Sequence, residues 1–311
     1  MKSLIIGGAG FVGHYLIEYL AQAGRNVYAT HLPNELTNKK ATSFELDILD
    51  YDACKQLLLH ISPDEIYHLA AQSSAAVSWK MPALTVDVNI KGTVNILEAI
   101  RHLEHKPRIL LVGSGEEYGI VTSDNLPIKE ELIAAPTSVY AATKATQTML
   151  GKLYANAYGL DIIMTRSFNH IGPGQLPTFV VSSFCKQIAE IEKGLCPPVI
   201  KVGNLSAKRD FTDVRDVVEA YLLLLEKGNA GEIYNVGSGN AISIQNILDE
   251  LLSLATVKIK VENDPERMRP SDVPIVFADI AKLKQATGWQ AKYAINDTLK
   301  DTFDAAMQAI I

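Results

Sequence analysis

The sequence predicts an α/β protein: a doubly wound parallel sheet with helices on both faces, joined to a smaller mixed α/β domain. Three observations support this prediction. Short, continuously apolar runs alternate with segments of helical periodicity through the first half of the chain, as strands buried on both faces do. A glycine-rich turn separates the first apolar run from the first helix. After about residue 168, prolines interrupt the alternation and basic residues occur in predicted loops.

The elements of the first half follow from two patterns. Residues 3–6 are an apolar run that ends in glycines, which predicts a buried strand. In residues 11–24, Val12, Leu16 and Leu20 recur at helical spacing, and Gly24 is a typical helix end. The same reasoning predicts strands at 26–30, 42–46, 65–69 and 108–113, and helices at 51–60, 86–103 and 138–158. Right-handed crossovers between such strands produce a doubly wound sheet.

The second half of the chain is predicted to form mainly the smaller domain. Helices fit 184–191, 214–227 and 243–254, and strands fit 232–236 and 257–261. No internal repeat or low-complexity linker separates the two halves. We therefore expect a first domain over residues 1–168, rejoined by about 212–240, and a second domain over residues 169–311 that is intertwined with the first.

Composition and charge exclude several classes of protein. A chain of 311 residues, 48% of them hydrophobic, can bury a large core without metals or disulfides. The net charge of −6 argues against a nucleic-acid surface, and no apolar run approaches the ~20 residues of a membrane span. Glycines break the first apolar run after four residues, which argues against a signal peptide. Cys54, Cys185 and Cys196 lack metal-ligand spacing and predict reduced thiols in the cytoplasm, with no metal site.

The glycine-rich turn predicts a dinucleotide-binding site. Gly7, Gly10 and Gly13 directly follow the first strand and begin the first helix. Gly7 permits a tight turn, Gly10 allows the backbone to approach a pyrophosphate, and Gly13 allows the helix to pack closely on the sheet. The N–H groups of the helix N-terminus would bind the phosphates. A plain strand-to-helix connection is the alternative, but the position of the turn in an alternating α/β chain favours the dinucleotide.

The end of the second strand bears on the choice of dinucleotide. A carboxylate there usually binds the ribose of NAD, whereas a basic side chain accommodates the 2′-phosphate of NADP. Here the sequence reads Ala29, Thr30 and His31, and Glu35 follows only in a predicted loop. The absence of an acid at the strand end favours NADP, with NAD as the alternative.

Asp47 and Ile48 directly follow the third predicted strand. This position favours a contact between Asp47 and the adenine of a bound dinucleotide. An equally good interpretation makes Asp47 the cap of the helix that begins at Tyr51.

Tyr140 and Lys144 place a phenol and an ammonium four residues apart, on one face of a helix. A cation beside a phenol favours the phenolate, so we expect the pKa of Tyr140 to fall from about 10 towards neutrality. Tyr140 would then exchange a proton at physiological pH. Ser114 follows the strand at 108–113, at the edge where parallel sheets build their sites, and would share a substrate carbonyl oxygen with Tyr140.

Five motifs give the sequence a resemblance to a known family. They are GGAGFVG (7–13), HLAAQSS (68–74), GSGEEYG (113–119), YAATK (140–144) and RSFNHIGPGQ (166–175). Together they resemble the extended short-chain dehydrogenase/reductase family, whose members act on nucleoside-diphosphate sugars, and the resemblance covers essentially the whole chain. It implies a Rossmann fold in which Tyr140 is the acid/base, Lys144 binds the nicotinamide ribose, Ser114 orients the substrate and Asn89 lies behind the site. It also implies that the cofactor is bound by Gly7, Gly10, Phe11, Val12, Gly13, His31, Asp47, Ile48, Leu69, Ala70, Ala71, Gln72, Tyr140 and Lys144.

Within this family, three segments resemble the GDP-mannose branch: 167–175, 201–216 and 268–274. The resemblance implies reduction by NAD(P)H of the 4-keto group of GDP-4-keto-6-deoxy-D-mannose, giving GDP-D-rhamnose. GDP-mannose 4,6-dehydration, another 4-ketoreductase or epimerase activity, and a non-catalytic NADP sensor are the alternatives. Glu116 occupies the place of the dehydratase base and is a candidate catalytic residue. Ser114 in place of the dehydratase threonine, Gly115 in place of an acid, and the RDFTDVRD segment favour the reductase.

The same resemblance supplies candidate contacts with the sugar nucleotide. Arg209 and Arg269 offer planar forks of donors to phosphate oxygens, and Lys186 offers a point charge. Arg209 has surface pairing with the neighbouring Asp210 as its alternative, and Lys186 a solvated helix face. His170 is expected to be a structural hydrogen-bonding residue. The full set implied to contact the substrate is Ser74, Ser114, Glu116, Asn169, Lys186, Val202, Asn204, Arg209, Arg269 and Asp272.

The helix at 138–158 carries apolar residues on more than one face, including Met149, Leu150, Leu153 and Tyr154. One face would pack on the sheet, and another is available to a second subunit. Family members usually dimerise through a four-helix bundle of this helix and the one at 86–103, so the resemblance implies a homodimer.

Overall fold

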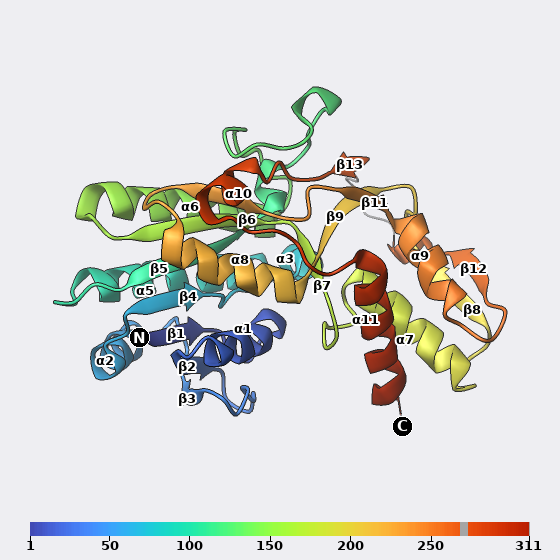
Figure 1. Ribbon diagram of the computed structural model, residues 1–311, viewed down its shortest axis with the longest axis horizontal. Helices are drawn as coiled ribbons and strands as arrows, with labels where there is room; N and C mark the ends of the chain where they lie inside the picture. The colour runs from blue at the N-terminus through green and yellow to red at the C-terminus, as the bar shows by residue number, and fades with distance from the viewer. Residues whose placement is uncertain (268–272, 311) are drawn as a thin grey trace.

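The protein is described here from a computed structural model that covers residues 1–267 and 273–310 (Figure 1). Its centre is a seven-stranded, fully parallel sheet in the order β10-β6-β5-β4-β1-β2-β3. This order confirms the doubly wound fold, because the chain builds outward from β1 in one direction and then returns to build outward in the other. The strands are β1 (Lys2–Ile6), β2 (Asn26–His31), β3 (Thr42–Glu45), β4 (Glu65–His68), β5 (Arg108–Ser114), β6 (Ile162–Ser167) and β10 (Ile233–Val236).

Alternating side chains of the central strands pack on two layers of helices. Ile5 belongs to one buried cluster, whereas its neighbours Leu4 and Ile6 belong to the other, as the two-residue period of a strand requires. The first cluster includes residues of α1 (Phe11–Gln22), α8 (Val214–Lys227) and α10 (Ala281–Thr287). The second includes residues of α2 (Tyr51–Ile61), α5 (Gly92–Arg101) and α6 (Val139–Tyr158). Both faces of the sheet are therefore covered.

A smaller lobe with its own hydrophobic cluster lies at one end of the molecule (Figure 1). Its helices are α7 (Val180–Glu192), α9 (Ile244–Ser253) and α11 (Ile295–Ala309). Its strands pair in two small sheets: β9 with β11, β13 and β7, and β8 with β12. Their bounds are β7 (Asn169–Ile171), β8 (Val199–Val202), β9 (Lys208–Asp213), β11 (Ala241–Ser243), β12 (Lys260–Asn263) and β13 (Ile275–Val276).

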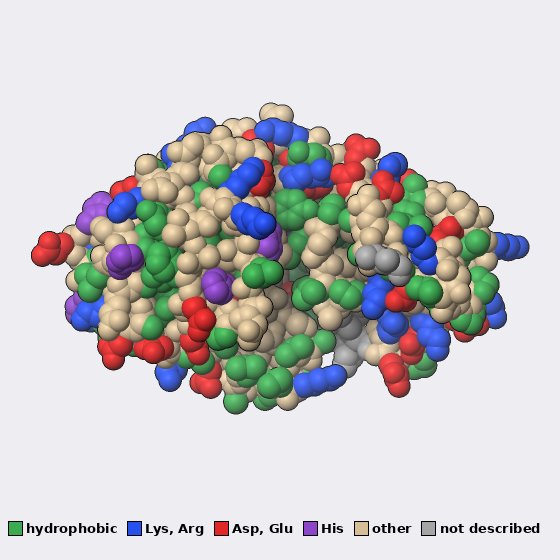
Figure 2. Space-filling model, turned by 90° about the horizontal axis from the view of Figure 1, so that it is seen from below, with side chains coloured by type: hydrophobic (Ala, Val, Ile, Leu, Met, Phe, Trp, Pro, Cys, Tyr) green, Lys and Arg blue, Asp and Glu red, His purple; other side chains and the backbone are tan. Residues whose placement is uncertain are grey.

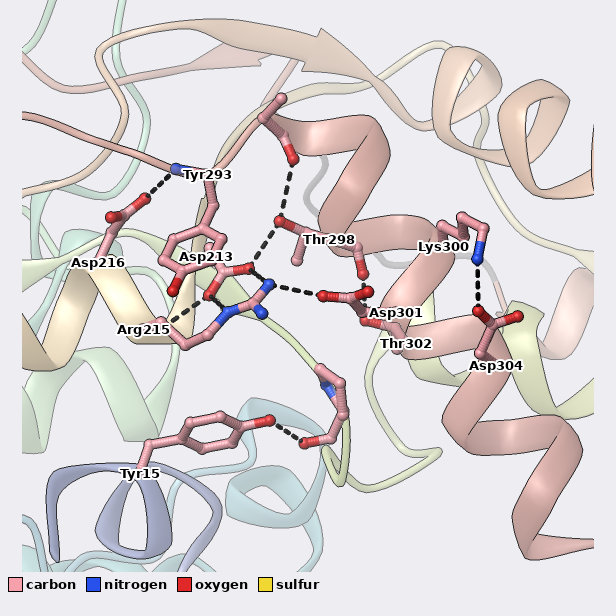
Figure 3. Close-up of polar contacts among 12 residues, drawn as sticks. Tyr15, Asp213, Arg215, Asp216, Tyr293, Thr298, Lys300, Asp301, Thr302 and Asp304 are labelled. Atoms are coloured by element: carbon pink, nitrogen blue, oxygen red, sulfur yellow. Dashed lines mark hydrogen bonds and ion pairs between the residues drawn. The ribbon is translucent and has the colours of Figure 1, made fainter. Parts of the chain in front are cut away.

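A cluster of charged and aromatic side chains joins this lobe to the central sheet (Figure 3). Asp213 ends β9 and caps α8, and its carboxylate accepts a hydrogen bond from Arg215 at 2.6 Å. The same guanidinium lies 2.9 Å from Asp301 of α11 and 3.8 Å from the centre of the Tyr293 ring. On the other side, Tyr15 of α1 donates to a carbonyl in the loop after β7. The two lobes are thus tied together at side chains of α1, α8 and α11.

Two of the predicted elements need correction. The strand expected at 257–261 lies at 260–263, because its register is set by pairing with β8, where Lys260 faces Val199. The single helix expected at 86–103 is interrupted by a π-helical turn, η1 (Asp87–Lys91), and follows two short helices, α3 (Ala75–Lys80) and α4 (Pro82–Val86). Three short 3₁₀ turns complete the described elements: η2 (Gly115–Tyr118), η3 (Ser123–Asn125) and η4 (Pro265–Arg267).

Candidate functional site

The candidate site lies where the strand order of the central sheet reverses. The chain leaves β1 for β2 and β3, then returns to β4 on the opposite side of β1. Open parallel sheets bind their ligands outside the carboxyl ends of the strands at such a point. Seen from below, the surface is hollowed between the larger and the smaller lobe, and Lys and Arg side chains stand on the smaller lobe beside the hollow (Figure 2).

The glycine-rich turn has a geometry that only glycine tolerates. Gly7 has a φ of 89°, and its N–H donates to the side chain of Thr30 at 3.0 Å. A Cβ on Gly7 would lie 2.7 Å from the backbone nitrogen of Ala70, and one on Gly13 would lie 2.5 Å from the carbonyl oxygen of Gly8. Both glycines are therefore required for the close approach of β1, α1 and the segment after β4.

The start of α1 is left open to a ligand. Its N-cap is Gly10, and no side chain caps this end of the helix. A Cβ on Gly10 would meet only the carbonyl oxygen of Gly7, at 3.5 Å. The first N–H groups of a helix need partners from outside the helix and favour anions. The cradle of glycine backbone and helix terminus thus fits the pyrophosphate of a dinucleotide, with Phe11 and Val12 half-buried behind it.

The end of β2 carries no acidic residue of its own. Thr30 is buried and holds the glycine turn, and His31 is half-buried with Nδ1 2.9 Å from the carbonyl oxygen of Leu32. The loop that follows nevertheless brings the carboxylate of Glu35 to the strand end, where it accepts a hydrogen bond from the N–H of Leu32, the residue directly after β2. The strand end alone therefore does not distinguish NADP from NAD.

Asp47 does not cap the helix that follows it. Its carboxylate accepts a hydrogen bond from Leu49 N–H at 2.9 Å, whereas the cap of α2 is Asp50, which accepts from Ala53 N–H. The capping interpretation of Asp47 is therefore wrong, because the chain enters the helix three residues later. Asp47 is exposed at the surface, and the side chain of Ile48 is buried beneath it.

The segment after β4 runs beside the glycine turn. The N–H groups of Leu69 and Ala70 both donate to the carbonyl oxygen of Ile6, at 2.9 and 2.8 Å. These residues and Ala71 are half-buried. The structure thus brings the residues expected to line the cofactor next to the cradle that Gly7 begins.

Asn89 fixes this segment from behind, as the family resemblance implied. Its side-chain oxygen accepts from Gln72 N–H at 2.8 Å, and its amide nitrogen donates to the Gln72 carbonyl at 3.1 Å and to Thr143 Oγ1 at 2.9 Å. The side chain of Gln72 in turn accepts a hydrogen bond from Ser74 N–H. Asn89 lies in the π-helical turn and so connects the segment after β4 with α6, the helix of Tyr140.

Ser114, Tyr140 and Glu116 meet at the carboxyl end of β5. Ser114 is buried, and its hydroxyl accepts a hydrogen bond from Glu116 N–H at 3.2 Å. Tyr140 is half-buried in the first turn of α6, close enough to the Ser114 side chain for a hydrogen bond that lowers the pKa of the phenol. Glu116 is exposed, and its negative charge raises the same pKa. The structure therefore brings together the serine, tyrosine and glutamate that the sequence singled out.

Lys144 is only 3% exposed, and two acceptors hold its ammonium group. It donates to the carbonyl oxygen of Val112 in β5 at 2.8 Å and to Oε1 of Gln147 at 3.0 Å. Burial lowers the pKa of Lys144 to about 8, and the charge of the buried Glu117 opposes this shift. The lysine thus lies beneath the site. Because its pKa is close to physiological pH, a small change in its surroundings changes the fraction of lysines that are charged.

The expected lowering of the pKa of Tyr140 is wrong for the protein alone. Burial is the largest influence and raises the pKa of Tyr140 above its ordinary value of 10.0, and the carboxylates of Glu116 and Glu117 raise it further. Desolvation disfavours a phenolate, and the neighbouring negative charges repel it. The ammonium expected to counter these effects is bound to Val112 and Gln147. Tyr140 is therefore a protonated phenol at neutral pH.

Two of the residues expected to bind phosphate oxygens lie near β9. Asn169 is exposed, and its amide donates to the carbonyl oxygen of Asp210. Arg209 is half-buried, and its guanidinium donates to the carbonyl oxygen of Val273. The carboxylate of Asp210 accepts hydrogen bonds from the loop that begins at Ser238.

The other expected substrate contacts are spread over the smaller lobe. Lys186 is exposed on α7, 3.7 Å from Glu190, which agrees with the interpretation of a solvated helix face. The side chain of Val202 is fully buried in the core of the lobe, so only its backbone is available to a ligand. Asn204 accepts hydrogen bonds from Ser206. Arg269 and Asp272 lie outside the described residues.

Sequence reasoning missed two buried groups at the site. Gln147 binds Lys144, and Glu117 accepts hydrogen bonds from Ser114 N–H and Thr148 and pairs with Arg166 at 2.9 Å. Gln147 lies three residues after Lys144, a spacing that places both on one helix face. That spacing was the available signal. The pairing of Glu117 with Arg166 had no local signal, because 49 residues separate them in the chain.

The ring of His170 lies near the start of α1. Its ring stacks on Phe11 with a centroid separation of 6.2 Å, and its Nδ1 is buried without a hydrogen-bond partner. Burial lowers the pKa of His170 to about 4. A neutral ring that packs on Phe11 agrees with a structural role, but the hydrogen bonding expected of this side chain is not borne out at Nδ1.

The described part of the chain contains no group of His, Cys, Asp and Glu side chains arranged to hold a metal ion. None of its helices combines the length and the apolar character that crossing a bilayer requires. The three cysteines are free thiols; Cys54 and Cys185 are buried, and Cys196 is exposed.

Comparison with known proteins identifies the family. The family model described as GDP-mannose 4,6 dehydratase matches residues 4–302. The chain belongs to this family. GDP-6-deoxy-D-mannose reductase from Pseudomonas aeruginosa is 36% identical over 299 residues, which cover 96% of this chain and 95% of that protein.

Solved structures support the same assignment. The structure of RMD from Pseudomonas aeruginosa complexed with NADPH is 34% identical, with a TM-score of 0.89 and full coverage of both chains. UDP-glucose 4-epimerase from Thermus thermophilus in complex with NAD is 30% identical, also with a TM-score of 0.89 and full coverage of both chains. The resemblance to extended short-chain dehydrogenases/reductases of the GDP-mannose branch is thereby confirmed.

Proposed function

We propose that this protein reduces the 4-keto group of a GDP-linked 4-keto-6-deoxy sugar, GDP-4-keto-6-deoxy-D-mannose, to give GDP-D-rhamnose. The observation that carries the proposal is the convergence of Ser114, Tyr140 and Lys144 at the carboxyl end of β5, beside the glycine cradle. The identity of 36% with a GDP-6-deoxy-D-mannose reductase over almost the whole of both chains supports the choice of substrate.

The protonated state of Tyr140 suits a reduction. NADPH, with its pyrophosphate in the glycine cradle, would supply a hydride to C4 of the sugar. Tyr140 donates its phenolic proton to the oxygen on C4, where negative charge develops, and Ser114 donates a hydrogen bond to the same oxygen. Lys144, whose ammonium is held by Val112 and Gln147, is proposed to bind the nicotinamide ribose. A carbonyl reduction needs a proton donor at this point, and burial keeps Tyr140 protonated for it.

The cofactor is proposed to be NADPH, with NADH as the alternative. The open N-terminus of α1 receives the pyrophosphate, and the segment Leu69–Gln72 lines the nicotinamide half. The similar structure from Pseudomonas aeruginosa was determined with NADPH, which supports the same choice.

The two lobes are proposed to bind different ligands. Residues 1–168, with the return of the chain through about 212–240, are proposed to bind the dinucleotide, and residues 169–311 mainly the GDP-sugar. On the substrate side we assign Ser74, Asn169, Lys186, Val202, Asn204, Arg209, Arg269 and Asp272. We place the reaction in the cytoplasm, in agreement with the free thiols.

GDP-mannose 4,6-dehydration is the second candidate function, and Glu116 is the observation that favours it. The carboxylate of Glu116 lies close enough to Tyr140 to raise its pKa, so it belongs to the same site. A dehydratase uses a carboxylate base at C5 of the sugar. The family model that matches the chain also carries the dehydratase description.

One assay separates the two functions. The purified protein is supplied either with GDP-mannose and catalytic NADP⁺ or with the GDP-4-keto-6-deoxy sugar and NADPH. A reductase leaves GDP-mannose unchanged and oxidises one NADPH for each keto sugar consumed. A dehydratase converts GDP-mannose to a 4-keto product without net consumption of cofactor. NADPH binding without turnover of any 4-keto sugar nucleotide would instead support a sensor.

Tyr140→Phe tests the proposed acid. The variant lacks the phenolic proton but keeps the ring, so we expect a loss of at least about 100-fold in kcat with little change in NADPH affinity. The affinity is measured by fluorescence titration and kcat by NADPH absorbance. Wild-type turnover in this variant would remove Tyr140 from the mechanism.

We also propose a homodimer formed, as the family resemblance implies, through α6 and the helical segment at 86–103, together with the neighbouring α3 and α4. Met149 and Leu153 of α6 are 65% and 60% exposed, and Leu84 of α4 and Trp79 of α3 are exposed beside them. A second copy of this surface would cover these apolar side chains. Sedimentation at micromolar concentration is expected to give the mass of a dimer, and Leu153→Glu the mass of a monomer. A monomeric wild-type protein would contradict the proposal.

A further inference from the structure

Two protein acceptors bind the buried ammonium of Lys144. It is buried at the carboxyl end of β5, where the carbonyl oxygen of Val112 accepts one of its protons at 2.8 Å and Oε1 of Gln147 a second at 3.0 Å. Gln147 is itself only 1% exposed. Water is therefore poorly placed to substitute for either acceptor.

The orientation of the Gln147 amide is dictated by Lys144. An ammonium has three donors and no acceptor, so the amide must present its oxygen to it. The NH₂ end is then directed into the protein, where Nε2 is buried without a hydrogen-bond partner. A buried donor without a partner is unfavourable. A leucine of similar size would avoid this cost, so packing alone does not explain an amide at position 147.

A neutral acceptor differs from a carboxylate in its effect on the lysine. A glutamate at 147 would bind the ammonium and also cancel much of its field. The nearby carboxylate of Glu117 already accepts hydrogen bonds from Ser114 N–H and Thr148 and pairs with Arg166. The amide oxygen of Gln147 thus stabilises the cation and leaves its positive charge effective at the site.

We infer that Gln147 is a positioning residue for the reduction, which holds the ammonium of Lys144 in place and in its charged form. The catalytic consequence rests on the proposed function, whereas the contact itself does not. The pKa of Lys144 is about 8, so the loss of one acceptor makes a part of the lysines neutral near physiological pH. The titratable groups that act on it are Glu117 of η2, whose charge raises this pKa, and His68 of β4, which is neutral because burial and Lys144 lower its pKa to about 3.

The first test uses the protein without ligands. Unfolding in urea is measured for the wild type, Gln147→Leu, Lys144→Met and the double variant, at pH 7 and at pH 9.5. At pH 7 we expect Gln147→Leu to lower the folding equilibrium constant at least tenfold more in the wild-type background than in the Lys144→Met background. At pH 9.5, where Lys144 is mostly neutral, this difference is expected to shrink. Equal effects in both backgrounds at both pH values would overturn the inference.

The second test follows the pH dependence of turnover. With NADPH and the GDP-4-keto-6-deoxy sugar, Gln147→Leu is expected to move the alkaline limb of the kcat profile down by about one pH unit, a tenfold change in acid dissociation. Gln147→Glu, which keeps an acceptor oxygen, is expected to move the same limb upward. A uniform decrease in kcat at all pH values, with an unmoved limb in both variants, would show a merely structural role and overturn the inference.

The two tests separate this inference from the proposed function. If the wild-type protein does not reduce the keto sugar, the proposed function fails, and the urea experiment still decides whether Gln147 supports the charge of Lys144. If Gln147→Leu does not fold, Gln147→Glu supplies the same comparison with opposite sign: its coupling to Lys144 at pH 7 should stabilise the protein.

Discussion

The buried ammonium of Lys144 should make the stability of the protein depend on pH in a way that a single substitution removes. Lys144→Met keeps an unbranched, apolar side chain of similar length in the same place and removes the charge. Burial disfavours the charged form of Lys144, so the wild-type protein bears an energetic cost that the variant does not. The comparison of the two proteins across pH isolates this cost.

The magnitude follows from the two pKa values of the lysine. Lys144 has an ordinary pKa of 10.5 and a pKa of about 8 in the folded protein. Between these values the unfolded chain binds a proton that the folded protein does not, so stability rises with pH. Below pH 8 the full cost of the buried cation is present, and it is lost as the pH rises towards 10.5. At about 1.36 kcal/mol per pKa unit, the change amounts to about 3 kcal/mol.

Urea unfolding of the wild type and of Lys144→Met at steps between pH 7 and pH 10 measures this change. We expect the free energy of unfolding of the wild type to rise relative to that of the variant by about 2.5 kcal/mol over this range, since pH 10 lies just below the ordinary pKa of 10.5. Lys152→Met is the matched control, because Lys152 is exposed on the same helix. A difference between wild type and Lys144→Met that stays constant from pH 7 to pH 10 would refute the reasoning.

Three further substitutions, with Gly24→Ala as a control, test the cradle, the tie between the lobes and the contact of Asn89 with Gln72 and α6. Gly7→Ala should lower the free energy of unfolding by about 2 kcal/mol or more, because the new Cβ would clash with Ala70 and φ is 89°. Gly24→Ala is the control: Gly24 has a φ of 75° but open space around it, so the loss should be only about 1 kcal/mol. Equal losses in thermal unfolding would contradict this. Asp213→Ala should destabilise by about 2 kcal/mol, because it removes the N-cap of α8 and the acceptor of Arg215 and Thr298, whereas Asp301 still pairs with the guanidinium. An unchanged free energy of unfolding in urea would contradict this. Asn89→Asp should lower the free energy of unfolding by about 2 kcal/mol, because it removes the hydrogen bonds that Asn89 donates to Gln72 and Thr143. Unchanged stability in urea would contradict this.

The main architecture could be predicted because its signals are local. Strand β1 is continuously apolar and ends in Gly7, and α1 repeats its apolar residues at helical spacing, so each element is recognisable from a window of about ten residues. The position of β12 was predicted wrongly because its signal is not local. Its position depends on pairing with β8, which lies about sixty residues earlier in the chain.

In the candidate site, too, local features could be predicted and features that depend on distant segments could not. The spacing of Tyr140 and Lys144 on one helix placed both correctly, because helix geometry fixes that relation. The direction of the pKa shift of Tyr140 was wrong, because burial and the charges of Glu116 and Glu117 act on it through space. The acceptors of the ammonium, Val112 and Gln147, likewise become neighbours only when α6 packs on β5.

The sequence by itself determined the alternation of strands and helices, the glycine cradle and the presence of a phenol, an ammonium and a hydroxyl at one edge of the sheet. Backbone conformation and side-chain periodicity are short-range properties, and a few neighbouring residues are enough to specify them. The tertiary structure alone decided which of these groups are charged, how the smaller lobe is attached and which buried amide supports the lysine. Those properties depend on burial and on charges brought together from distant segments, and neither exists until the chain has folded.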